Sequence, residues 1–435
     1  MADASMAART PWAWVPTLYL AEGLPYALVM SVSVVLYKNF NVSNRTITLW
    51  LFFLGLPWIF KPLWSPVVDI LKTRRLWIWT LQLLAGAVLA GTALALPWPH
   101  FLRLTLAGFC LLAFSSATHD VAADGFYILA MSEHQQAWFS GVRNTFYRLA
   151  NIAAQGGLVI FAGQMQKHTG SYTTAWMLTL ALAGGILLAL GTYHGLILPR
   201  PAGDVPGPLA SAGTFSRDFV ETFILFFRKP QILTILAFLV LYRFGEAQLF
   251  NVAKLFLLDA RTAGGLVLTD NQYGRIYGII GVASLLLGGL LGGFVVARHG
   301  LKFWLWPMLL AIHLPDAVFI WLAYAQPANL VAIGAGVALE QFGYGFGFTA
   351  FMLYMIYLAR GPHATAHYAI CTGFMALGMN LPNLWSGWLQ EQIGYPHFFI
   401  WVLLATIPSF IVALKIPLEA EFGKRTLGLA EKELR

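Results

Sequence analysis

The amino-acid sequence predicts an all-α membrane protein whose twelve transmembrane helices form two six-helix bundles. Of its 435 residues, 58% are hydrophobic and only 11% are charged, whereas a soluble globular protein carries roughly 25% charged residues. Twelve segments are predominantly apolar over about 20 residues, the length that crosses the hydrocarbon core of a bilayer as a helix. A long polar stretch after the sixth segment divides them into six and six.

Each predicted span is an apolar window bounded by loop residues. In chain order the windows are 12–36, 47–69, 76–97, 101–130, 136–164, 172–197, 231–258, 272–297, 303–325, 329–358, 365–390 and 396–416. Proline and glycine interrupt several of them, as in "GLP" at 23–25, "LPW" at 56–58 and "NLPN" at 380–383. Such breaks are tolerated in membrane helices, particularly where the helices line a cavity.

The polar stretch 198–230 is expected to be a cytoplasmic linker between two domains. Its first part is rich in Pro and Gly, and its second part, from Phe215, has the pattern of a short amphipathic surface helix. The predicted domains are therefore the six-helix bundles 1–197 and 231–416, followed by a cytoplasmic tail at 417–435.

The distribution of Lys and Arg predicts that both chain termini are cytoplasmic. With the N-terminus placed inside, sixteen Lys and Arg residues fall in or beside the cytoplasmic loops and five fall on the opposite side. Cytoplasmic loops of membrane proteins carry an excess of these residues. The net charge of +8 is therefore assigned to topology, and nucleic acid is not an expected partner.

The sequence offers no catalytic or cofactor-binding apparatus. It has no Walker P-loop and no His/Cys cluster with zinc spacing. Cys110 and Cys371 each fall within a predicted span and are interpreted as small apolar packing residues. We therefore expect neither an enzyme nor a protein with a cofactor or a structural metal.

Ten ionisable residues lie deep within the predicted spans. On insertion scales each costs about 2.5–3.5 kcal/mol at the centre of a membrane helix. Their sum exceeds the net stability of a typical protein, so they are expected to pair, to bind a ligand or to line a shared aqueous chamber between the two bundles. They are Glu22, Lys61, Asp120, Asp124, Arg143, Arg148, Arg243, Glu246, Asp316 and Glu340.

Two of these acids have the spacing expected of a proton carrier. Asp120 and Asp124 are four residues apart and therefore share one helix face. Two carboxylates placed so closely repel each other, which favours the protonated form of one of them. We assign proton coupling to Asp120 and Asp124, with Glu22 as a third candidate.

Several cations and polar residues are candidates for binding an anionic solute. Lys61, Arg148 and Arg243 would hold the anion, because arginine grips a carboxylate with two N–H groups and lysine acts as a point charge. Asn144 and Tyr147 lie beside Arg148 on the fifth span. Glu246 and Glu340 complete the predicted binding residues.

Structural alternatives exist for some of these residues. Arg243 and Glu246 are three residues apart, so they could be an ion pair that only packs helices. Glu340 lies in "LEQFGYGFGF", whose glycines favour close helix packing. His119 and His313 are interpreted as hydrogen-bonding packing residues, with proton transfer as the alternative.

The two halves of the sequence repeat one pattern. "SPVVDILKTRRL" follows the second span, and "GGFVVARHGLK" follows the eighth. Twelve spans in two parallel halves with such basic turns resemble the major facilitator superfamily. That resemblance implies a cytoplasmic latch of Asp69, Arg74 and Arg75 that stabilises one conformation; the alternative is that the two arginines only set topology.

Within that superfamily the chain resembles the AmpG-type permeases of the peptide/acetyl-CoA transporter branch. The resemblance lies in "EGLPYAL" (22–28), "WIFKPLWSPVVD" (58–69), "SSATHDVAADGF" (115–126), "FYRLANIAAQGG" (146–157) and "LVLYRFGEA" (239–247). It implies proton-driven import of anhydro-muropeptides, the sugar–peptide fragments of the cell wall. It implicates Lys61, Asp120, Asp124, Arg148, Arg243 and Glu246.

The sequence therefore predicts a proton-coupled importer of an anionic solute, working by alternating access in the bacterial inner membrane. Its partners would be the solute, protons and membrane lipids, and by analogy with the superfamily it would be a monomer. Ferric siderophores and acyl-CoA are alternative anionic solutes. A ligand-binding receptor that moves nothing and a lipid flippase are alternatives of a different class.

Overall fold

The computed structural model describes residues 10–42, 44–205 and 212–424, and this part of the chain is helical, with no β-strand. By the packing of its Cα atoms the chain divides into two compact units. The first unit is Met1–Met131, Arg143–Phe223 and Ala359–Ala369, and the second is Ser132–Val142, Ile224–Leu358 and Ile370–Arg435. The domain boundaries and the cytoplasmic placement of the termini stay predictions.

Nine helical segments among the described residues are long and apolar enough to cross a membrane. They are Pro11–Asn39, Arg74–Ala95, Phe101–Ala130, Tyr172–Ile197, Ile232–Leu258, Gly274–His299, Leu301–Ala325, Leu330–Ala359 and Trp385–Ala413. The predicted windows 47–69, 136–164 and 365–390 are helical over most of their length but are not among the nine. The first is broken at Lys61, and the second carries Arg143 and Arg148 on a largely polar helix. The count of twelve therefore stays a prediction.

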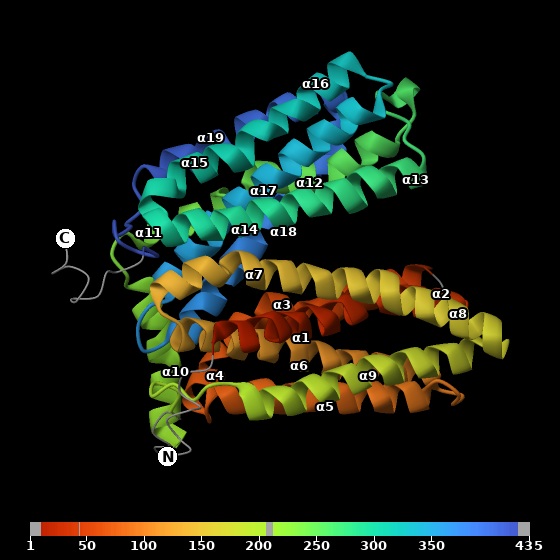
Figure 1. Ribbon diagram of the computed structural model, residues 1–435, viewed down its shortest axis with the longest axis vertical. Coiled ribbons are helices and arrows are strands. Elements are labelled where there is room, and N and C mark those ends of the chain that lie inside the picture. Colours follow the sequence, from red (N-terminus) through yellow and green to blue (C-terminus); the bar gives the residue numbers. More distant parts are fainter. Residues whose placement is uncertain (1–9, 43, 206–211, 425–435) are drawn as a thin grey trace. The chain divides into compact units, whose positions relative to one another are not determined.

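The first unit is a bundle of long helices with several short turns between them (Figure 1). Its elements are η1 (Pro11–Ala13), α1 (Val15–Ala27), η2 (Leu28–Val32), α2 (Ser33–Asn39), α3 (Asn44–Phe60), η3 (Lys61–Leu63), α4 (Ser65–Ile70), α5 (Arg74–Ala95), α6 (Phe101–Ala130), η4 (Ala153–Leu158), α8 (Val159–Thr169) and α9 (Tyr172–Ile197). Three further helices are divided between the two units: α7 (Glu133–Ile152), α10 (Ala212–Phe227) and α18 (Ala364–Ala405).

Small residues allow the helices of the first unit to approach closely. Helices α5 and α9 run side by side (Figure 1), and a Cβ added to Gly86 would lie 2.8 Å from the carbonyl oxygen of Gly184. On α1, a Cβ added to Gly23 would lie 2.6 Å from the carbonyl oxygen of Tyr147. Glycine at these positions removes the side chain that would hold the backbones apart. Gly23 thereby brings α1, with Glu22, against α7.

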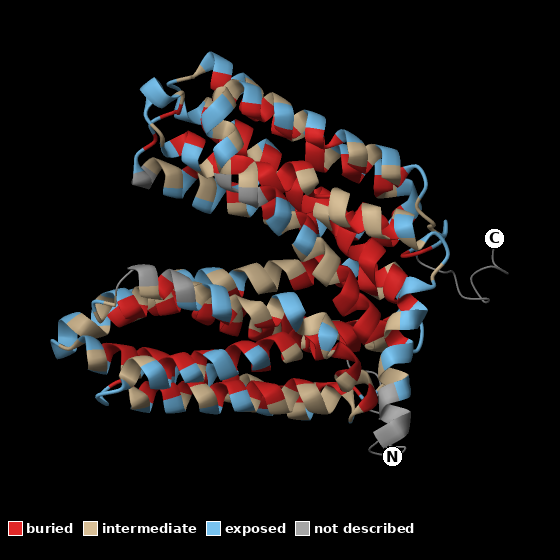
Figure 2. Ribbon diagram, turned by 180° about the vertical axis from the view of Figure 1, so that it is seen from behind, coloured by how far each residue is buried: buried red, intermediate tan, exposed pale blue. Residues whose placement is uncertain are grey.

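The second unit is built in the same way. Its elements are α11 (Ile232–Leu241), α12 (Phe244–Leu258), η5 (Arg261–Ala263), α13 (Asp270–Tyr273), η6 (Gly274–Gly281), α14 (Val282–His299), α15 (Leu301–His313), η7 (Leu314–Asp316), α16 (Ala317–Ala325), α17 (Leu330–Ala359) and α19 (Ile407–Ala413). In both units the buried residues lie on the sides of the helices that face their neighbours (Figure 2).

The glycines of "LEQFGYGFGF" pack α17 against two other helices. A Cβ added to Gly345 would clash with the carbonyl oxygen of Leu285 on α14, and one added to Gly343 would clash with that of Ala311 on α15. The predicted packing role of these glycines is therefore confirmed. The close contacts fix the position of α17 and of Glu340, which lies one turn before Gly343.

Candidate transport site

Asp120 and Asp124 are the centre of a charged cluster in the first unit. Both lie on α6 and are 6% and 5% exposed. Lys61 Nζ lies 3.6 Å from Asp120 Oδ2, and Arg143 Nη2 lies 2.5 Å from Asp124 Oδ1. Each carboxylate of the pair therefore has a cation of its own, which offsets the repulsion expected from their spacing.

Breaks and aromatic rings position the two cations. Lys61 begins the 3₁₀ turn η3, where Pro62 prevents the continuation of α3. The guanidinium carbon of Arg143 lies 4.4 Å from the ring centre of Tyr19 and 4.9 Å from that of Tyr127. Tyr19 also donates a hydrogen bond of 3.4 Å to Asp124 Oδ1. Cation–π contacts of this kind stabilise a desolvated cation.

Glu22 brings a third carboxyl group to the same cluster. It is 6% exposed on α1, and its Oε2 atom has no hydrogen-bond partner among the described residues. Asp120 and Asp124 are close enough to interact with it electrostatically. Asp120 Oδ1 is likewise buried without a hydrogen bond in the described part of the chain. The cluster thus contains three acids and two cations that pair with two of them.

The other predicted residues of the first unit lie on α7 beyond Arg143. Asn144, Tyr147 and Arg148 are partly buried. The ring of Tyr147 lies 6.5 Å from that of Tyr26, centre to centre. These residues extend the polar surface of α7 next to the charged cluster.

In the second unit Arg243 and Glu246 form the ion pair that their spacing predicts. Arg243 Nη2 lies 2.8 Å and Nε 2.9 Å from Glu246 Oε2. Arg243 also donates to Tyr344 Oη at 2.8 Å and to Met379 Sδ at 2.8 Å. With both side chains 3% exposed, the pair is fully enclosed by the second unit.

Glu340 lies on α17 in a separate polar group of the second unit. Its Oε2 atom accepts a hydrogen bond of 2.9 Å from Gln341 Nε2, and Gln341 donates to Tyr277 Oη at 3.3 Å. Lys254 Nζ lies 3.7 Å from the ring centre of Phe250 and 5.9 Å from that of Tyr277. Lys254 is a cation that the sequence analysis did not single out.

Asp69 and Arg74 form an ion pair of 2.6 Å beside the beginning of α18. Arg74 Nε donates to Thr365 Oγ1 at 2.6 Å, and the backbone N–H of Ala366 donates to Asp69 Oδ2 at 3.1 Å. The predicted latch residues are thus joined to a segment almost 300 residues further along the chain.

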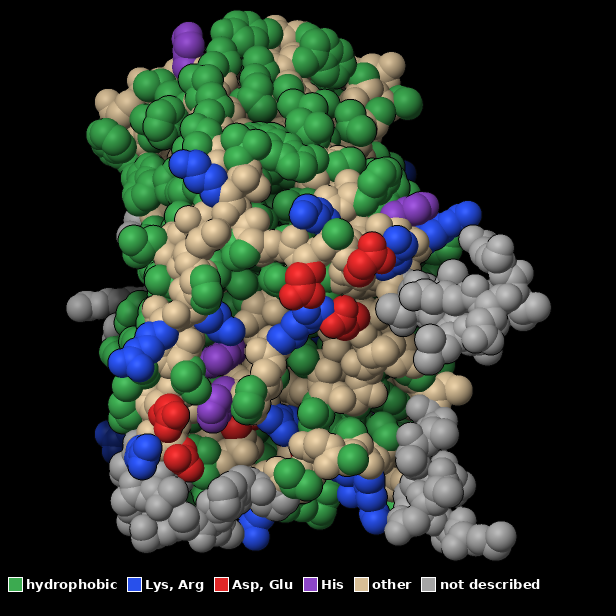
Figure 3. Space-filling model, turned by 90° about the vertical axis from the view of Figure 1, so that its left-hand side faces the viewer, with side chains coloured by type: hydrophobic (Ala, Val, Ile, Leu, Met, Phe, Trp, Pro, Cys, Tyr) green, Lys and Arg blue, Asp and Glu red, His purple; other side chains and the backbone are tan. Residues whose placement is uncertain are grey.

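Arg75 makes a different set of contacts from Arg74. Its guanidinium donates to the carbonyl oxygens of Leu198, at 3.2 Å, and Gly195. Asp204, in the polar stretch 198–230, accepts backbone hydrogen bonds from Arg74 at 2.8 Å and Arg75 at 3.1 Å. A carboxylate at the N-terminus of α5 satisfies N–H groups that have no partner within the helix. Figure 3 looks onto the side of the molecule that carries α10, where charged and His side chains reach the surface.

His119 takes part in a buried hydrogen-bonded chain through the first unit. Gln82 Nε2 lies 2.8 Å from His119 Nε2, and Gln82 Oε1 lies 2.7 Å from His194 Nδ1. His194 Nε2 is 3.0 Å from Thr17 Oγ1. The arrangement links α1, α5, α6 and α9 and agrees with the interpretation of His119 as a hydrogen-bonding packing residue.

The sequence analysis did not assign two residues, Arg143 and Asp204, to the candidate site or the latch. Arg143 was counted among the buried charges but not assigned to the site, because neither its spacing nor its neighbours in sequence indicate Asp124 as its partner. Asp204 lies among prolines and glycines and was interpreted as part of a linker. The available signal for Arg143 was the balance of three cations (Lys61, Arg143, Arg148) and three acids (Glu22, Asp120, Asp124) within the predicted spans of the first half of the chain.

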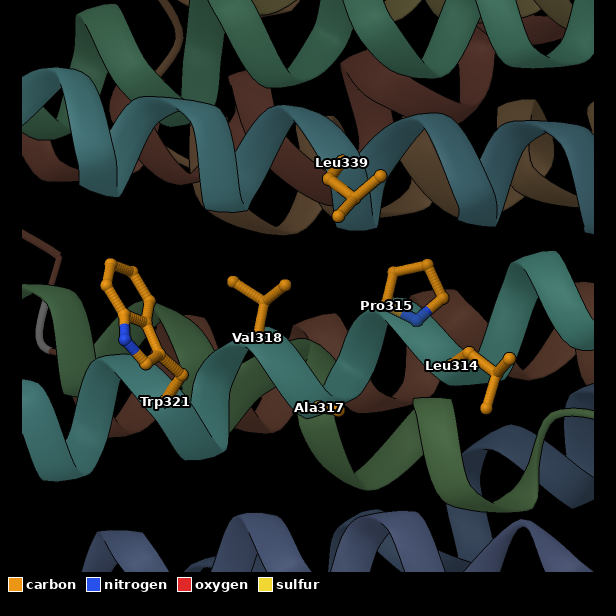
Figure 4. A pocket seen from close by; sticks show the side chains of 6 residues that line it. All are labelled: Leu314, Pro315, Ala317, Val318, Trp321 and Leu339. Atoms are coloured by element: carbon orange, nitrogen blue, oxygen red, sulfur yellow. The ribbon is translucent and has the colours of Figure 1, made fainter.

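A surface pocket of the second unit contains none of the predicted site residues. It has a volume of about 400 Å³ and is lined by Leu314, Pro315, Ala317, Val318, Trp321 and Leu339. Figure 4 shows Trp321, Val318 and Pro315 pointing toward Leu339 of α17. The lining is apolar and provides no group that would recognise a charged solute.

Sequence comparisons found transporters that are similar to this chain. No protein-family model matches the chain. A Rickettsia conorii protein named as transporter AmpG 4 is 24% identical over 409 residues, covering 91% of this chain and 94% of that protein. The anhydromuropeptide permease of Escherichia coli K12 is 24% identical over 402 residues, covering 91% of this chain and 78% of that permease.

A solved structure shares the fold over almost the whole chain. The major facilitator superfamily transporter FucP, crystallised in an outward conformation, superposes with a TM-score of 0.67 at 16% identity, covering 94% of this chain and 99% of FucP. The chain therefore has the fold of the major facilitator superfamily transporter FucP. In sequence it is similar to AmpG-type permeases over 91% of its length.

Proposed function

We propose that the chain is a proton-coupled importer of anhydro-muropeptides that works by alternating access. The observation that carries the proposal is the pairing of Asp120 with Lys61 and of Asp124 with Arg143, at 3.6 and 2.5 Å. Carboxylates and cations of this kind inside membrane spans mark the pathways of ions and substrates. The name of the Escherichia coli relative supplies the substrate class.

Protonation can be coupled to solute binding through these pairs. A proton on Asp124 or Asp120 removes the charge that holds Arg143 or Lys61, which leaves the cation free to bind a carboxylate of the solute. The proton and the anion would then favour the same conformation, because each changes the relative stability of the two states. Glu22, whose Oε2 lacks a hydrogen-bond partner among the described residues, is the third proposed proton carrier.

The remaining site residues have binding roles in this proposal. Arg148, Asn144 and Tyr147 contact the solute from α7, and Arg243, Glu246 and Glu340 contact it in the second unit. Asp69, Arg74 and Arg75 act as the latch that stabilises one conformation. We also propose that both termini are cytoplasmic and that the working form is a monomer with twelve spans.

Uptake into proteoliposomes tests the coupling. Purified protein is reconstituted, an inward proton gradient is imposed, and accumulation of labelled anhydro-muropeptide is followed with and without a protonophore. The proposal expects accumulation that disappears when the gradient is collapsed. Accumulation that is unchanged by the protonophore would show that transport is not proton-coupled, and no accumulation of the ligand would exclude this solute.

Matched variants test the residues. Asp124→Asn is expected to abolish gradient-driven accumulation and to preserve exchange of labelled for unlabelled solute. Asp259→Asn is the control, because Asp259 is the C-cap residue of α12 in the second unit and its Oδ2 accepts a hydrogen bond of 2.6 Å from Tyr395. Wild-type accumulation by Asp124→Asn would remove Asp124 from the proton path. Competition by acyl-CoA or a ferric siderophore, but not by anhydro-muropeptide, would reassign the substrate.

A further inference from the structure

Asp316 is a buried acid in the second unit without a hydrogen bond among the described residues. It is 1% exposed, and neither Oδ1 nor Oδ2 has a hydrogen-bond partner in the part of the chain that the structure describes. The other two buried acids of the same unit differ in this respect. Glu246 pairs with Arg243 at 2.8 Å, and Glu340 accepts a hydrogen bond of 2.9 Å from Gln341.

The side chain of Asp316 receives no hydrogen bond from the backbone of its own turn. Asp316 follows Pro315 in the 3₁₀ turn η7 and continues directly into α16 with helical backbone angles (φ −57°, ψ −27°). The N–H group of Ala317 already donates to the carbonyl oxygens of Leu314 and Pro315. A helix that continues from a preceding turn lacks the free N–H groups that a capping side chain would accept from. The carboxyl group of Asp316 makes no capping hydrogen bond.

Close packing encloses this turn. A Cβ added to Gly343 on α17 would lie 2.9 Å from Pro315 Cγ. Pro315 and Ala317 line the apolar surface pocket, whereas Asp316 itself does not. The sequence neighbours of Asp316 therefore point toward an apolar surface, and its own side chain is covered by the second unit.

Among the described residues, the titratable groups that interact with Asp316 supply no cation to balance a negative charge. Glu340 on α17 and Glu246 on α12 are the acids close enough to interact with it electrostatically, and Glu246 is already paired with Arg243. His313, at the end of α15, is fully buried and its Nε2 lies 3.1 Å from Ser409 Oγ. An ionised carboxylate in such surroundings would be buried without a partner and beside other negative charge, which strongly favours the neutral form.

We propose that Asp316 is a proton-binding site of the second unit, which carries a proton at neutral pH and can exchange it when the surrounding helices move. A metal cation is a less suitable occupant, because the described residues contain no group of three or more potential metal ligands. Binding of the proton does not depend on the proposed function. The use of this proton in transport does rest on that function, where it would supplement the acids of the first unit.

Infrared difference spectroscopy of the purified full-length protein tests the binding site directly. A protonated carboxyl group has a C=O stretching band that a carboxylate lacks. We expect wild type to show such a band at neutral pH, Asp316→Asn to lose it, and the control Asp259→Asn to retain it. An Asp316→Glu variant, which keeps a carboxyl group, is expected to shift the band, and it serves as the test if Asp316→Asn does not fold.

Two results would overturn the proposal. Identical carboxyl bands in wild type and Asp316→Asn would show that Asp316 is ionised. A band that appears in wild type only after sodium is removed would show that the site binds a metal cation.

Transport assays separate this proposal from the proposed function. Asp316→Asn is expected to keep solute exchange and to lose at least tenfold in accumulation driven by a proton gradient. If wild type itself shows no gradient-driven accumulation, the proposed function fails while the infrared result still decides whether Asp316 binds a proton. Undiminished accumulation by Asp316→Asn would exclude this proton from the coupling mechanism.

Discussion

Replacing the partners of the Arg143–Asp124 pair one at a time is expected to give unequal losses of stability. Removal of one partner from a buried ion pair costs about 3–5 kcal/mol. In Asp124→Asn the guanidinium stays charged, but the rings of Tyr19 and Tyr127, 4.4 and 4.9 Å away, retain about 1–2 kcal/mol of cation–π stabilisation. We therefore expect this variant to lose about 1–4 kcal/mol of unfolding free energy.

Arg143→Met leaves the Asp124 carboxylate buried without its cation and without a ring contact that would offset its charge. We therefore expect this variant to lose about 3–5 kcal/mol of unfolding free energy. The double variant is expected to lie within about 1–2 kcal/mol of wild type, because apolar or neutral replacement of both partners removes the buried charges.

Equilibrium unfolding in mixed detergent micelles measures these differences. Equal losses for the two single variants would refute the reasoning. So would a double variant whose loss equals the sum of the two single losses, because additivity would mean that the pair does not interact.

Three further predictions concern residues away from that pair. Asp204→Ala is expected to lower unfolding free energy by about 1–3 kcal/mol, because two backbone N–H groups at the start of α5 lose a charged acceptor; hydrogen exchange at Arg74 and Arg75 should accelerate. Gln82→Leu is expected to cost about 1–3 kcal/mol, because both His119 and His194 lose a buried partner, and thermal unfolding would record the change. Gly345→Val is expected to prevent close packing of α17, which would appear as loss of monodisperse protein in size-exclusion chromatography.

Each of these predictions has a control and a contradicting result. Asp218→Ala, an acid on the partly exposed helix α10, should leave exchange at α5 unchanged, and equal acceleration in both variants would contradict a specific role for Asp204. Gln82→Glu keeps a hydrogen-bond acceptor at this position. It tests whether the loss of unfolding free energy in Gln82→Leu comes from a lost hydrogen bond rather than from a change in side-chain volume. Gly185→Val, on α9, adds the same side chain where a Cβ meets nothing within 4 Å, and an equal loss of monodisperse protein in both variants would contradict a specific packing role for Gly345.

Local spacing predicted some of these features and could not predict others. The Arg243–Glu246 pair follows from three residues of separation on one helix, and the sequence contains that information. The Lys61–Asp120 and Arg143–Asp124 pairs join different helices, so their geometry depends on how α3, α6 and α7 pack. The apolar windows predicted the positions of most helices because the hydrophobicity of a segment depends only on its own residues.

The polar residues of the linker stretch were the hardest to interpret. Asp204 follows Pro201 and Gly203, a context typical of a flexible connection, and nothing in it indicates the backbone of α5. Asp316 was identified as a buried charge, but the absence of a partner among the described residues can be established only from coordinates. Sequence therefore located the charges, and tertiary packing determined which of them are neutralised.

The attachment of Ala359–Ala369 to the first unit has a consequence for biogenesis. Asp69 and Arg74 obtain Ala366 and Thr365 as partners only after the ribosome has synthesised more than three quarters of the chain. During most of translation the first unit must therefore remain in the membrane without the hydrogen bonds that Thr365 and Ala366 make with Arg74 and Asp69. A fragment ending in the stretch 198–230 would lack the same partners, and supplying the remainder as a separate polypeptide should restore them by fragment complementation.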